Sequence, residues 1–360
     1  MRRILTVCLA VLLIAVVAVV VAAAVVSGSI YDEQIDTAHP RDHLIAPANF
    51  ALTFARVATA SGNRIILVQA FDSASISGVD LNARFDAAYD SPVAIYRRYG
   101  YAALAALAAT GPASHFTTDS LILPVDFAAA HIAAGTNFRA HAEEVMIEDG
   151  PFLFPKLVTP TGWDADVPEM TRLDYEVELC AIPLEDVATA SRTRTTLGFL
   201  LCGDFTERWT LIRDIDLDAP MGTTGFVDAK GQRGSLPVGS LLVIPRDAQS
   251  FIDEVDIELY VNGELRQRSA ASQMIWRPQQ ILEVALNQCA RTYHRASGTV
   301  PLTDCSAIPA RTLILTGTPA GVSFHVLNIW YPGAYLQPGD RVLSRGTYLG
   351  VLDNTIRSTR

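Results

Sequence analysis

The sequence predicts an α+β fold in which strands dominate. From about Leu121 onward, short apolar runs of strand length alternate with turns rich in Gly and Pro, and helical patterns are rare. Within this region Asn262-Gly263 separates two strand-like runs, which is the strongest two-residue signal for a β-hairpin. Half of the 360 residues are hydrophobic and 18% are charged, so the chain is globular and long enough for one large domain or two ordinary ones.

The N-terminal segment differs from the rest of the chain. Arg2 and Arg3 precede an apolar run, residues 4–26, which is long enough to cross a bilayer as a helix. A cleavable signal peptide usually has a shorter apolar region, although the small residues after this run would permit cleavage. We expect residues 1–28 to be a membrane anchor or uncleaved signal, with a cytoplasmic N-terminus and an extracytoplasmic body, because the arginines precede the run.

The charge balance argues against nucleic acid as a partner. The formal net charge is −10, and no long run of basic residues occurs. Proteins that bind nucleic acid neutralise phosphates with clustered Lys and Arg side chains. We therefore expect no nucleic-acid binding.

The five cysteines fit an extracytoplasmic body without requiring one. Cys180 and Cys202 lie in apolar strand-like runs, which predicts buried thiols. Cys289 and Cys305 flank a polar segment that they would close as a disulfide in an oxidising compartment; two free thiols are the alternative. No pair of cysteines has the spacing of a zinc site.

Residues 29–118 are expected to form a linker and a small N-terminal subdomain. Ser61-Gly62-Asn63 marks a turn that leads into a strand at 64–68. Residues 92–110 have helical periodicity and many alanines, and Gly111-Pro112 ends this helix. No motif in the region carries recognisable chemistry.

Residues 119–356 are expected to form the larger, strand-rich domain. The sequence predicts helices at 139–144 and 278–289. The strand-like runs lie at 121–125, 152–156, 173–179, 198–204, 257–261, 313–315 and 341–343. Gly/Pro-rich turns separate most of them, as in a sheet whose neighbouring strands are joined by short connections.

The run at 173–179 alternates apolar and polar residues, which places Glu176 and Glu178 on one face of a strand. That face is either solvated, or it lines a pocket in which the two carboxylates share a cation. Oxygen ligands favour Mg²⁺, Mn²⁺ or Ca²⁺. If the strand at 198–204 is a neighbour, Asp204 supplies a third carboxylate.

A second candidate group lies on the short helix at 139–144. His141 and Glu144 are three residues apart and therefore share a helix face. A carboxylate beside an imidazole orients the ring and raises its basicity, as a general base acting on water requires. The alternative is a solvated surface helix with no chemical role.

Seven short motifs, in this order, resemble those of the fumarylacetoacetate hydrolase family. They lie at 135–141, 173–179, 203–204, 230–231, 261–264, 315–322 and 338–340. Together they span about residues 121–345, most of the folded body. The resemblance implies a mixed β-sheet roll of the family's C-terminal type, and a possible homodimer because members are often dimeric.

The resemblance also implies roles for individual residues. In the family, a Glu-x-Glu strand and a later Asp bind Mg²⁺ or Mn²⁺, a His–Glu pair activates water, and a Lys and a turn Thr complete the site. The matching positions are Glu176, Glu178 and Asp204 for the metal, His141 and Glu144 for the water, and Lys230 and Thr318.

The chain departs from the family on both sides of Asp204. Gly203 stands where the family usually has Asn, and of a following Arg-Asp-x-Gln-like pattern only the arginine has a counterpart, Arg208. We expect Arg208 and Thr318 to contact the substrate. Residues 323–335 form an insertion that either reshapes the pocket or packs as a separate surface loop.

The resemblance implies a divalent-metal-dependent hydrolase that cleaves a carbon–carbon bond in a diketo acid or acylpyruvate-like substrate. A small oxo acid would chelate the metal, His141 would deprotonate water, and Lys230 would stabilise the oxyanion. The alternatives are a decarboxylase, isomerase or hydratase of a 2-oxo acid on the same scaffold, or an anchored binding protein without catalysis.

Overall fold

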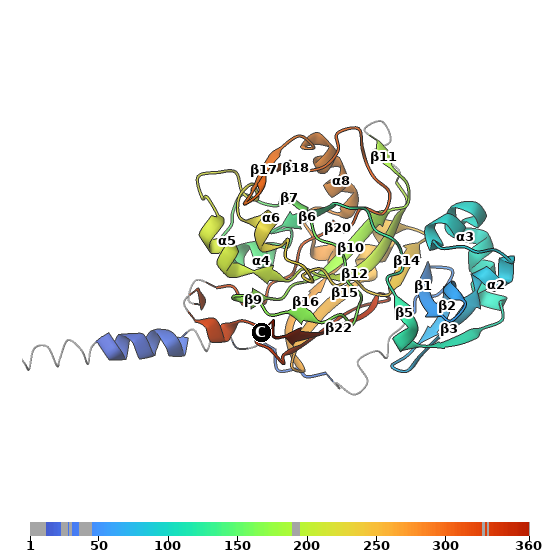
Figure 1. Ribbon diagram of the computed structural model, residues 1–360, viewed down its shortest axis with the longest axis horizontal. Coiled ribbons are helices and arrows are strands. Elements are labelled where there is room, and N and C mark those ends of the chain that lie inside the picture. Colours follow the sequence, from blue (N-terminus) through green and yellow to red (C-terminus); the bar gives the residue numbers. More distant parts are fainter. Residues whose placement is uncertain are drawn as a thin grey trace, which may run out of the picture.

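A computed structural model describes residues 12–22, 28, 31–35, 45–188, 195–325, 328–329 and 331–359. Two β-sheets form its centre (Figure 1). The larger sheet contains β1 (Ala51–Thr59), β2 (Gly62–Phe71), β3 (Ser75–Asp80), β4 (Ser114–Thr117), β5 (Leu121–Ile122), β6 (His131–Gly135), β7 (Phe152–Lys156), β10 (Val177–Pro183), β12 (Leu197–Gly203), β14 (Leu241–Pro245) and β20 (Ile314–Leu315). The smaller sheet contains β8 (Val167–Pro168), β15 (Asp256–Val261), β16 (Glu264–Ala270), β21 (Arg341–Gly346) and β22 (Gly350–Arg357).

Short strand pairs and helices surround the two sheets. The pairs are β9 (Leu173–Asp174) with β13 (Thr206–Glu207), β11 (Val187–Ala188) with β19 (Ala307–Ile308), and β17 (Thr292–Arg295) with β18 (Gly298–Pro301). The α-helices are α2 (Leu81–Phe85), α3 (Pro92–Thr110), α4 (Arg139–Glu144), α5 (Arg208–Asp214), α6 (Phe226–Ala229), α7 (Ala248–Glu254) and α8 (Pro278–Asn287). The 3₁₀ turns are η1 (Thr118–Ser120), η3 (Ala271–Gln273) and η5 (Pro332–Ala334).

The larger sheet runs in the order β4-β3-β2-β1-β14-β12-β10-β20-β6-β7, and the smaller in the order β16-β15-β21-β22-β8. β20 is parallel to β6 and β22 is parallel to β8, whereas the other pairings of these sheets are antiparallel. β10 contacts β15, and β12 contacts β21 and β22, so the sheets pack on each other through their central strands. The predicted α+β, mostly β fold with mixed sheets is confirmed.

Several elements form as the local sequence predicts. α3 spans the predicted residues, begins with Pro92 at a position where proline is favoured, and ends at Gly111. α4 also spans its predicted residues. Asn262 and Gly263 both have positive φ angles, of 52° and 89°, as a two-residue type I′ hairpin turn between β15 and β16 requires.

The run at 173–179 is not one strand. Its first two residues form β9, which pairs with β13, and only from Val177 does the chain enter β10. The solvated-face alternative for Glu176 and Glu178 is wrong, because these side chains are only 4% and 1% exposed. All seven residues of β10 are buried, so neither face of this strand reaches solvent.

The cysteines form two disulfides within the described residues. The prediction of buried thiols at Cys180 and Cys202 is wrong, because the two residues are bonded across the antiparallel neighbours β10 and β12. Their Cα atoms are 5.9 Å apart, within the usual range for a disulfide. Cys289 and Cys305 form the disulfide that the sequence allowed, and the segment between them contains the β17–β18 hairpin.

The N-terminal strands extend the larger sheet. β1 pairs with β14, so the sheet is continuous across residue 118, and α3 packs on β1 and β2 at one end of the molecule (Figure 1). The division into domains at 118/119 stays a prediction. Most of the expected anchor, residues 1–28, lies outside the described residues; 12–22 are helical. In the described part of the chain, no helix has the length and apolarity needed to span a bilayer.

Candidate metal centre and active site

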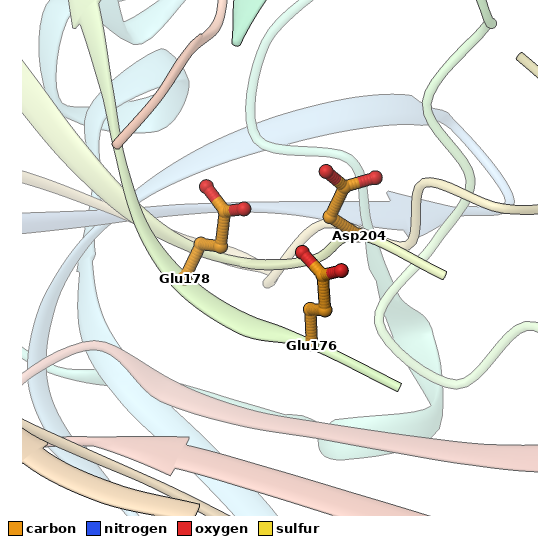
Figure 2. Close-up of side chains that lie close together, drawn as sticks. All are labelled: Glu176, Glu178 and Asp204. Carbon is orange, nitrogen blue, oxygen red and sulfur yellow. The ribbon is translucent and has the colours of Figure 1, made fainter. Parts of the chain in front are cut away.

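Three buried carboxylates meet where β10 begins and β12 ends. Val177 lies opposite Gly203 in the strand register, so Glu176 and Asp204 flank the last pair of the ladder. The Asp204 N–H donates to the Glu176 carbonyl over 2.9 Å and holds the two residues together. One carboxylate oxygen from each of Glu176, Glu178 and Asp204 lies within 4.8 Å of the others, and Figure 2 shows the three side chains extending into a common region.

Buried cations neutralise part of this charge. Lys230 Nζ, just after α6, donates to Glu176 over 2.7 Å and to Asp204 over 2.9 Å. Lys156 Nζ, at the end of β7, donates to the other Asp204 oxygen over 2.5 Å. Burial by itself would raise the pKa of Asp204, but the two ammonium groups hold it below its ordinary value.

Glu178 has a different environment. Its Oε2 accepts a hydrogen bond from the Gly317 N–H over 2.7 Å. Burial, together with the negative charges of Asp204 and Glu176, raises the pKa of Glu178 well above its ordinary value. A divalent cation among the three carboxylates would remove this repulsion, and three hard oxygen donors suit Mg²⁺, Mn²⁺ or Ca²⁺. The residues present therefore fit a metal ion.

The turn that carries Gly317 is hydrogen-bonded to β10. Thr318 Oγ1 donates to the Val177 carbonyl over 3.0 Å. Gln267, on β16 of the smaller sheet, donates to Thr318 Oγ1 over 2.9 Å and accepts from the Val177 N–H over 3.0 Å. This buried glutamine joins the two sheets beside the candidate metal ligands, and sequence reasoning missed it.

His141 and Glu144 meet as their spacing predicts. His141 Nδ1 lies 3.0 Å from Glu144 Oε2, and Glu144 Oε1 accepts from the Gly321 N–H over 3.0 Å. His141 is only 7% exposed. The solvated-helix alternative is therefore wrong, because both side chains are held against the turn that follows β20.

One cavity is lined both by residues of the carboxylate cluster and its partners and by the His141–Glu144 pair. It has a volume of about 530 Å³, and Glu176, Lys230, Arg208, His141, Glu144 and Thr318 all line it. Phe324, His325 and Ile329 line it as well, so the insertion forms part of the pocket wall. The remaining lining is largely apolar and includes Ile147, Phe152, Phe154, Leu211, Ile212, Ile215 and Phe226.

Residues 130–357 match the family model described as fumarylacetoacetate hydrolase C-terminal. The chain belongs to the fumarylacetoacetate hydrolase family. An uncharacterized protein of Staphylococcus epidermidis is 29% identical over 248 residues, which cover 67% of this chain and 73% of that protein.

Solved structures share the family fold with this chain. A fumarylacetoacetate hydrolase from Exiguobacterium antarcticum has a TM-score of 0.59 at 21% identity, over 85% of this chain and 99% of its own. A 5-carboxymethyl-2-hydroxymuconate delta-isomerase from Mycobacterium smegmatis has a TM-score of 0.53 at 20% identity, over 86% and 99%. These family neighbours are enzymes, a hydrolase and an isomerase, and at these identities they establish the fold alone.

The departure from the family pattern at Gly203 has a steric reason. A Cβ atom at this position would lie 2.9 Å from Pro237 Cγ and 3.1 Å from the Phe205 ring, so the family's usual asparagine would require the neighbours to shift. Arg208 keeps the family's arginine. Its Nε donates to Asp174 over 2.8 Å and its Nη2 to Glu176 over 2.7 Å, so it links Asp174 to one of the three candidate metal ligands.

Asp174 and Lys156 contact residues of the candidate site, and sequence reasoning missed both. Asp174 accepts from the N–H groups of Ser323 and Phe324 over 2.8 Å and 3.1 Å, so it fixes the start of the insertion as well as Arg208. Asp174 belongs to the same alternating run as Glu176 and Glu178. A third acidic residue in that run was the sequence signal that could have indicated its place beside the site. For Lys156 the only sequence signal was one positive charge at the end of an apolar run, which does not distinguish a buried lysine from an exposed one.

Proposed function

We propose that this chain is a divalent-metal-dependent hydrolase that cleaves a carbon–carbon bond in a diketo acid or acylpyruvate-like substrate. The observation that carries the proposal is that Glu176, one of the three clustered carboxylates, lines the same cavity as the His141–Glu144 pair. Carboxylates of this kind suit chelation of an oxo acid through a metal. An oriented imidazole beside them suits activation of water.

Glu176, Glu178 and Asp204 would hold Mg²⁺ or Mn²⁺, with Ca²⁺ a further option. Bound there, the ion supplies Lewis-acid polarisation of the oxo-acid oxygens. These residues lie at the start of β10 and just beyond the end of β12, and hydrogen bonds from Gly317 and Thr206 orient two of the carboxylates. The chain itself therefore positions the head of the substrate.

His141 would act as the general base. A proton on Nδ1, donated to Glu144, leaves Nε2 free to accept a proton from water. Glu144 is itself held by the Gly321 N–H, so the ring has a fixed orientation. The resulting hydroxide oxygen bonds to the distal carbonyl carbon, the adjacent carbon–carbon bond breaks, and the proton taken by His141 returns to the carbon that leaves. The products are a carboxylic acid and a 2-oxo acid.

Lys230 would stabilise the oxyanion at the attacked carbon. Its ammonium group lies on the cavity and is fully charged, because the neighbouring carboxylates raise its pKa against the opposing effect of burial. Arg208 and Thr318 line the same end of the cavity and would contact the oxo-acid head. Arg208 already donates to the Glu176 carboxylate, and Thr318 to the Val177 carbonyl.

Turnover of acylpyruvates with Mg²⁺ or Mn²⁺ tests the proposal. We expect two carbon fragments from each substrate molecule. His141→Asn should lower kcat by about 10²–10⁴-fold, the usual contribution of general base catalysis. Absence of turnover by the wild type, or full activity of His141→Asn, would refute the proposed reaction.

A reaction without attack by water is the second candidate. An isomerase is among the solved structures that share this fold, and a proton-transferring pair such as His141 and Glu144 suits isomerisation as well. Product analysis separates the candidates. A single isomeric product indicates an isomerase, carbon dioxide a decarboxylase, and two fragments from water a hydrolase. Turnover of any kind would exclude a protein that only binds oxo acids.

We also propose that the body is extracytoplasmic and anchored through residues 1–28. Two disulfides support this placement, because disulfides persist in oxidising compartments. The arginines that precede the apolar run support the same orientation. Protease added to intact spheroplasts should degrade the body. Protection until the membrane is broken would contradict the proposed topology.

A further inference from the structure

We infer that the arm of the substrate, beyond the chelating oxo-acid head, is an uncharged apolar group and not a chain that ends in a second carboxylate. This inference rests on the proposed function and specifies its substrate class. The cavity has room for such an arm, because its volume of about 530 Å³ far exceeds that of a two-carbon oxo-acid head.

The side chains of α5 that line the cavity change from charged to aliphatic along the helix. Arg208, the first residue of the helix, lies at the carboxylates, whereas Leu211 and Ile212 follow one turn later and Ile215 about 10 Å along the axis. All four line the cavity. An arm that leaves the metal centre in this direction therefore passes from charged groups to aliphatic ones.

Aromatic rings continue this apolar wall. The rings of Phe152 and Phe226 are 5.0 Å apart between centroids in an edge-to-face arrangement, and those of Phe154 and Phe226 are 5.4 Å apart. Edge-to-face packing fixes ring positions, so the wall is preformed. At the mouth, Met146 and Leu217 line the cavity although they are 69% and 80% exposed. The apolar surface thus reaches from the metal centre to solvent.

The lysine and arginine of the described lining are already paired. Lys230 contacts Glu176 and Asp204, and Arg208 contacts Asp174 and Glu176. Both belong to the chelating end. A carboxylate at the tip of the arm would lie against the aliphatic side chains of α5, and burying such a charge without a counter-ion is costly. A methyl or aromatic tip carries no such cost.

Binding of matched 2-oxo acids tests the inference. The full chain, loaded with Mg²⁺ or Mn²⁺, is titrated by calorimetry with 2-oxohexanoate, 2-oxoadipate and 2-oxooctanoate. The first two have the same chain length and differ in a terminal methyl or carboxylate. We expect 2-oxohexanoate to bind at least tenfold more tightly than 2-oxoadipate. We expect 2-oxooctanoate to bind about 15-fold more tightly than 2-oxohexanoate, because each buried methylene contributes about fourfold.

Two variants of one wall residue provide the control. Ile212→Lys places a cation on the apolar wall and should bring the affinity for 2-oxoadipate above that for 2-oxohexanoate. Ile212→Gln has a similar length without the charge, and should weaken 2-oxooctanoate binding without improving binding of the diacid. If Ile212→Lys does not fold, the wild-type series still decides the matter.

The binding data distinguish a failure of this inference from a failure of the proposed function. Tighter wild-type binding of 2-oxoadipate than of 2-oxohexanoate would overturn the inference and leave the proposed function standing. Loss of that preference in His325→Leu would then assign the carboxylate to the histidine of the insertion. Binding of none of the three acids to the metal-loaded chain would overturn the proposed function and, with it, the inference.

Discussion

Replacing Glu178 by Gln should separate metal binding from folding. The side chain is buried, and its neighbours Asp204 and Glu176 raise its pKa well above the ordinary value, so its charge opposes folding in the absence of metal. Two full charges 4.8 Å apart would repel by about 3 kcal/mol at an effective dielectric constant of 20. Gln keeps the shape and the carbonyl that accepts from Gly317. We therefore expect a higher free energy of unfolding for metal-free Glu178→Gln at pH 7.

Metal should reduce this difference in the free energy of unfolding between the variant and the wild type, because the wild type gains more from binding it. Loss of a group that is hydrogen-bonded to a metal ligand typically costs about 10–100-fold in metal affinity, so loss of one ligand of three should cost at least about 100-fold. At a metal concentration of 100 Kd, wild-type protein gains about 2.7 kcal/mol. The variant, at a concentration then equal to its own Kd, gains about 0.4 kcal/mol by the same relation.

Urea denaturation with and without Mg²⁺ or Mn²⁺ measures both effects. Glu264→Gln is the control, because that side chain is 53% exposed on the hairpin turn and its replacement should leave the metal-dependent gain unchanged. Equal stabilisation of Glu178→Gln and wild type by metal would show that Glu178 is not a ligand. A less stable metal-free variant would show that the repulsion argument is wrong.

Three further predictions concern stability. Lys156→Met should lower the free energy of unfolding by about 3–5 kcal/mol in urea titrations, because it leaves one buried oxygen of Asp204 without its ammonium partner; an unchanged value would show that Lys230 alone satisfies that carboxylate. Burial lowers the pKa of His131 to about 4, so wild-type stability should fall by about 3 kcal/mol as the pH drops from 6.5 to 4, where the unfolded chain binds the proton first. His131→Asn should lack that portion of the pH dependence, and an identical pH profile would assign it to other groups. Replacing Cys289 and Cys305 by Ala should cost about 3 kcal/mol, as expected for a loop of 16 residues; equal midpoints of oxidised and variant proteins would contradict this.

Local patterns were enough to predict most of the candidate site. The alternation around Glu176 and Glu178 placed both on one side of the chain, and the three-residue spacing of His141 and Glu144 placed them in contact. Such periodicities depend only on the local geometry of a helix or strand, so the neighbours that they predict do not depend on how the rest of the chain packs. The ordered motifs then indicated that Asp204 would join the two glutamates.

Residues that act across long sequence separations escaped prediction. Gln267 is 90 residues from Val177, to which it hydrogen-bonds, and Lys156 is 48 residues from Asp204. Nothing in the local sequence distinguishes a buried, paired lysine from an exposed one. Their partners depend on how the two sheets pack, which periodicity does not specify.

The period-two pattern also misled in one respect. The alternation is typical of a strand with one solvent-exposed face. Both faces of β10 are buried, however, and its polar side chain Glu178 lies among other charged groups in the interior. The same burial explains Cys180 and Cys202. Each looks like an apolar core residue in its own strand, and only the pairing of β10 with β12 brings the sulfurs together.

The bond between Cys180 and Cys202 matters to anyone who purifies this protein. Each cysteine is two residues from a candidate metal ligand, Glu178 on one strand and Asp204 beyond the other. A chain made in a reducing host never acquires this link, and dithiothreitol in the lysis buffer would preserve that state. The spacing of the two ligand-bearing strands would then depend on hydrogen bonds alone. Material from an oxidising host and material from a reducing host are therefore different samples of one sequence, and their metal titrations should not be pooled.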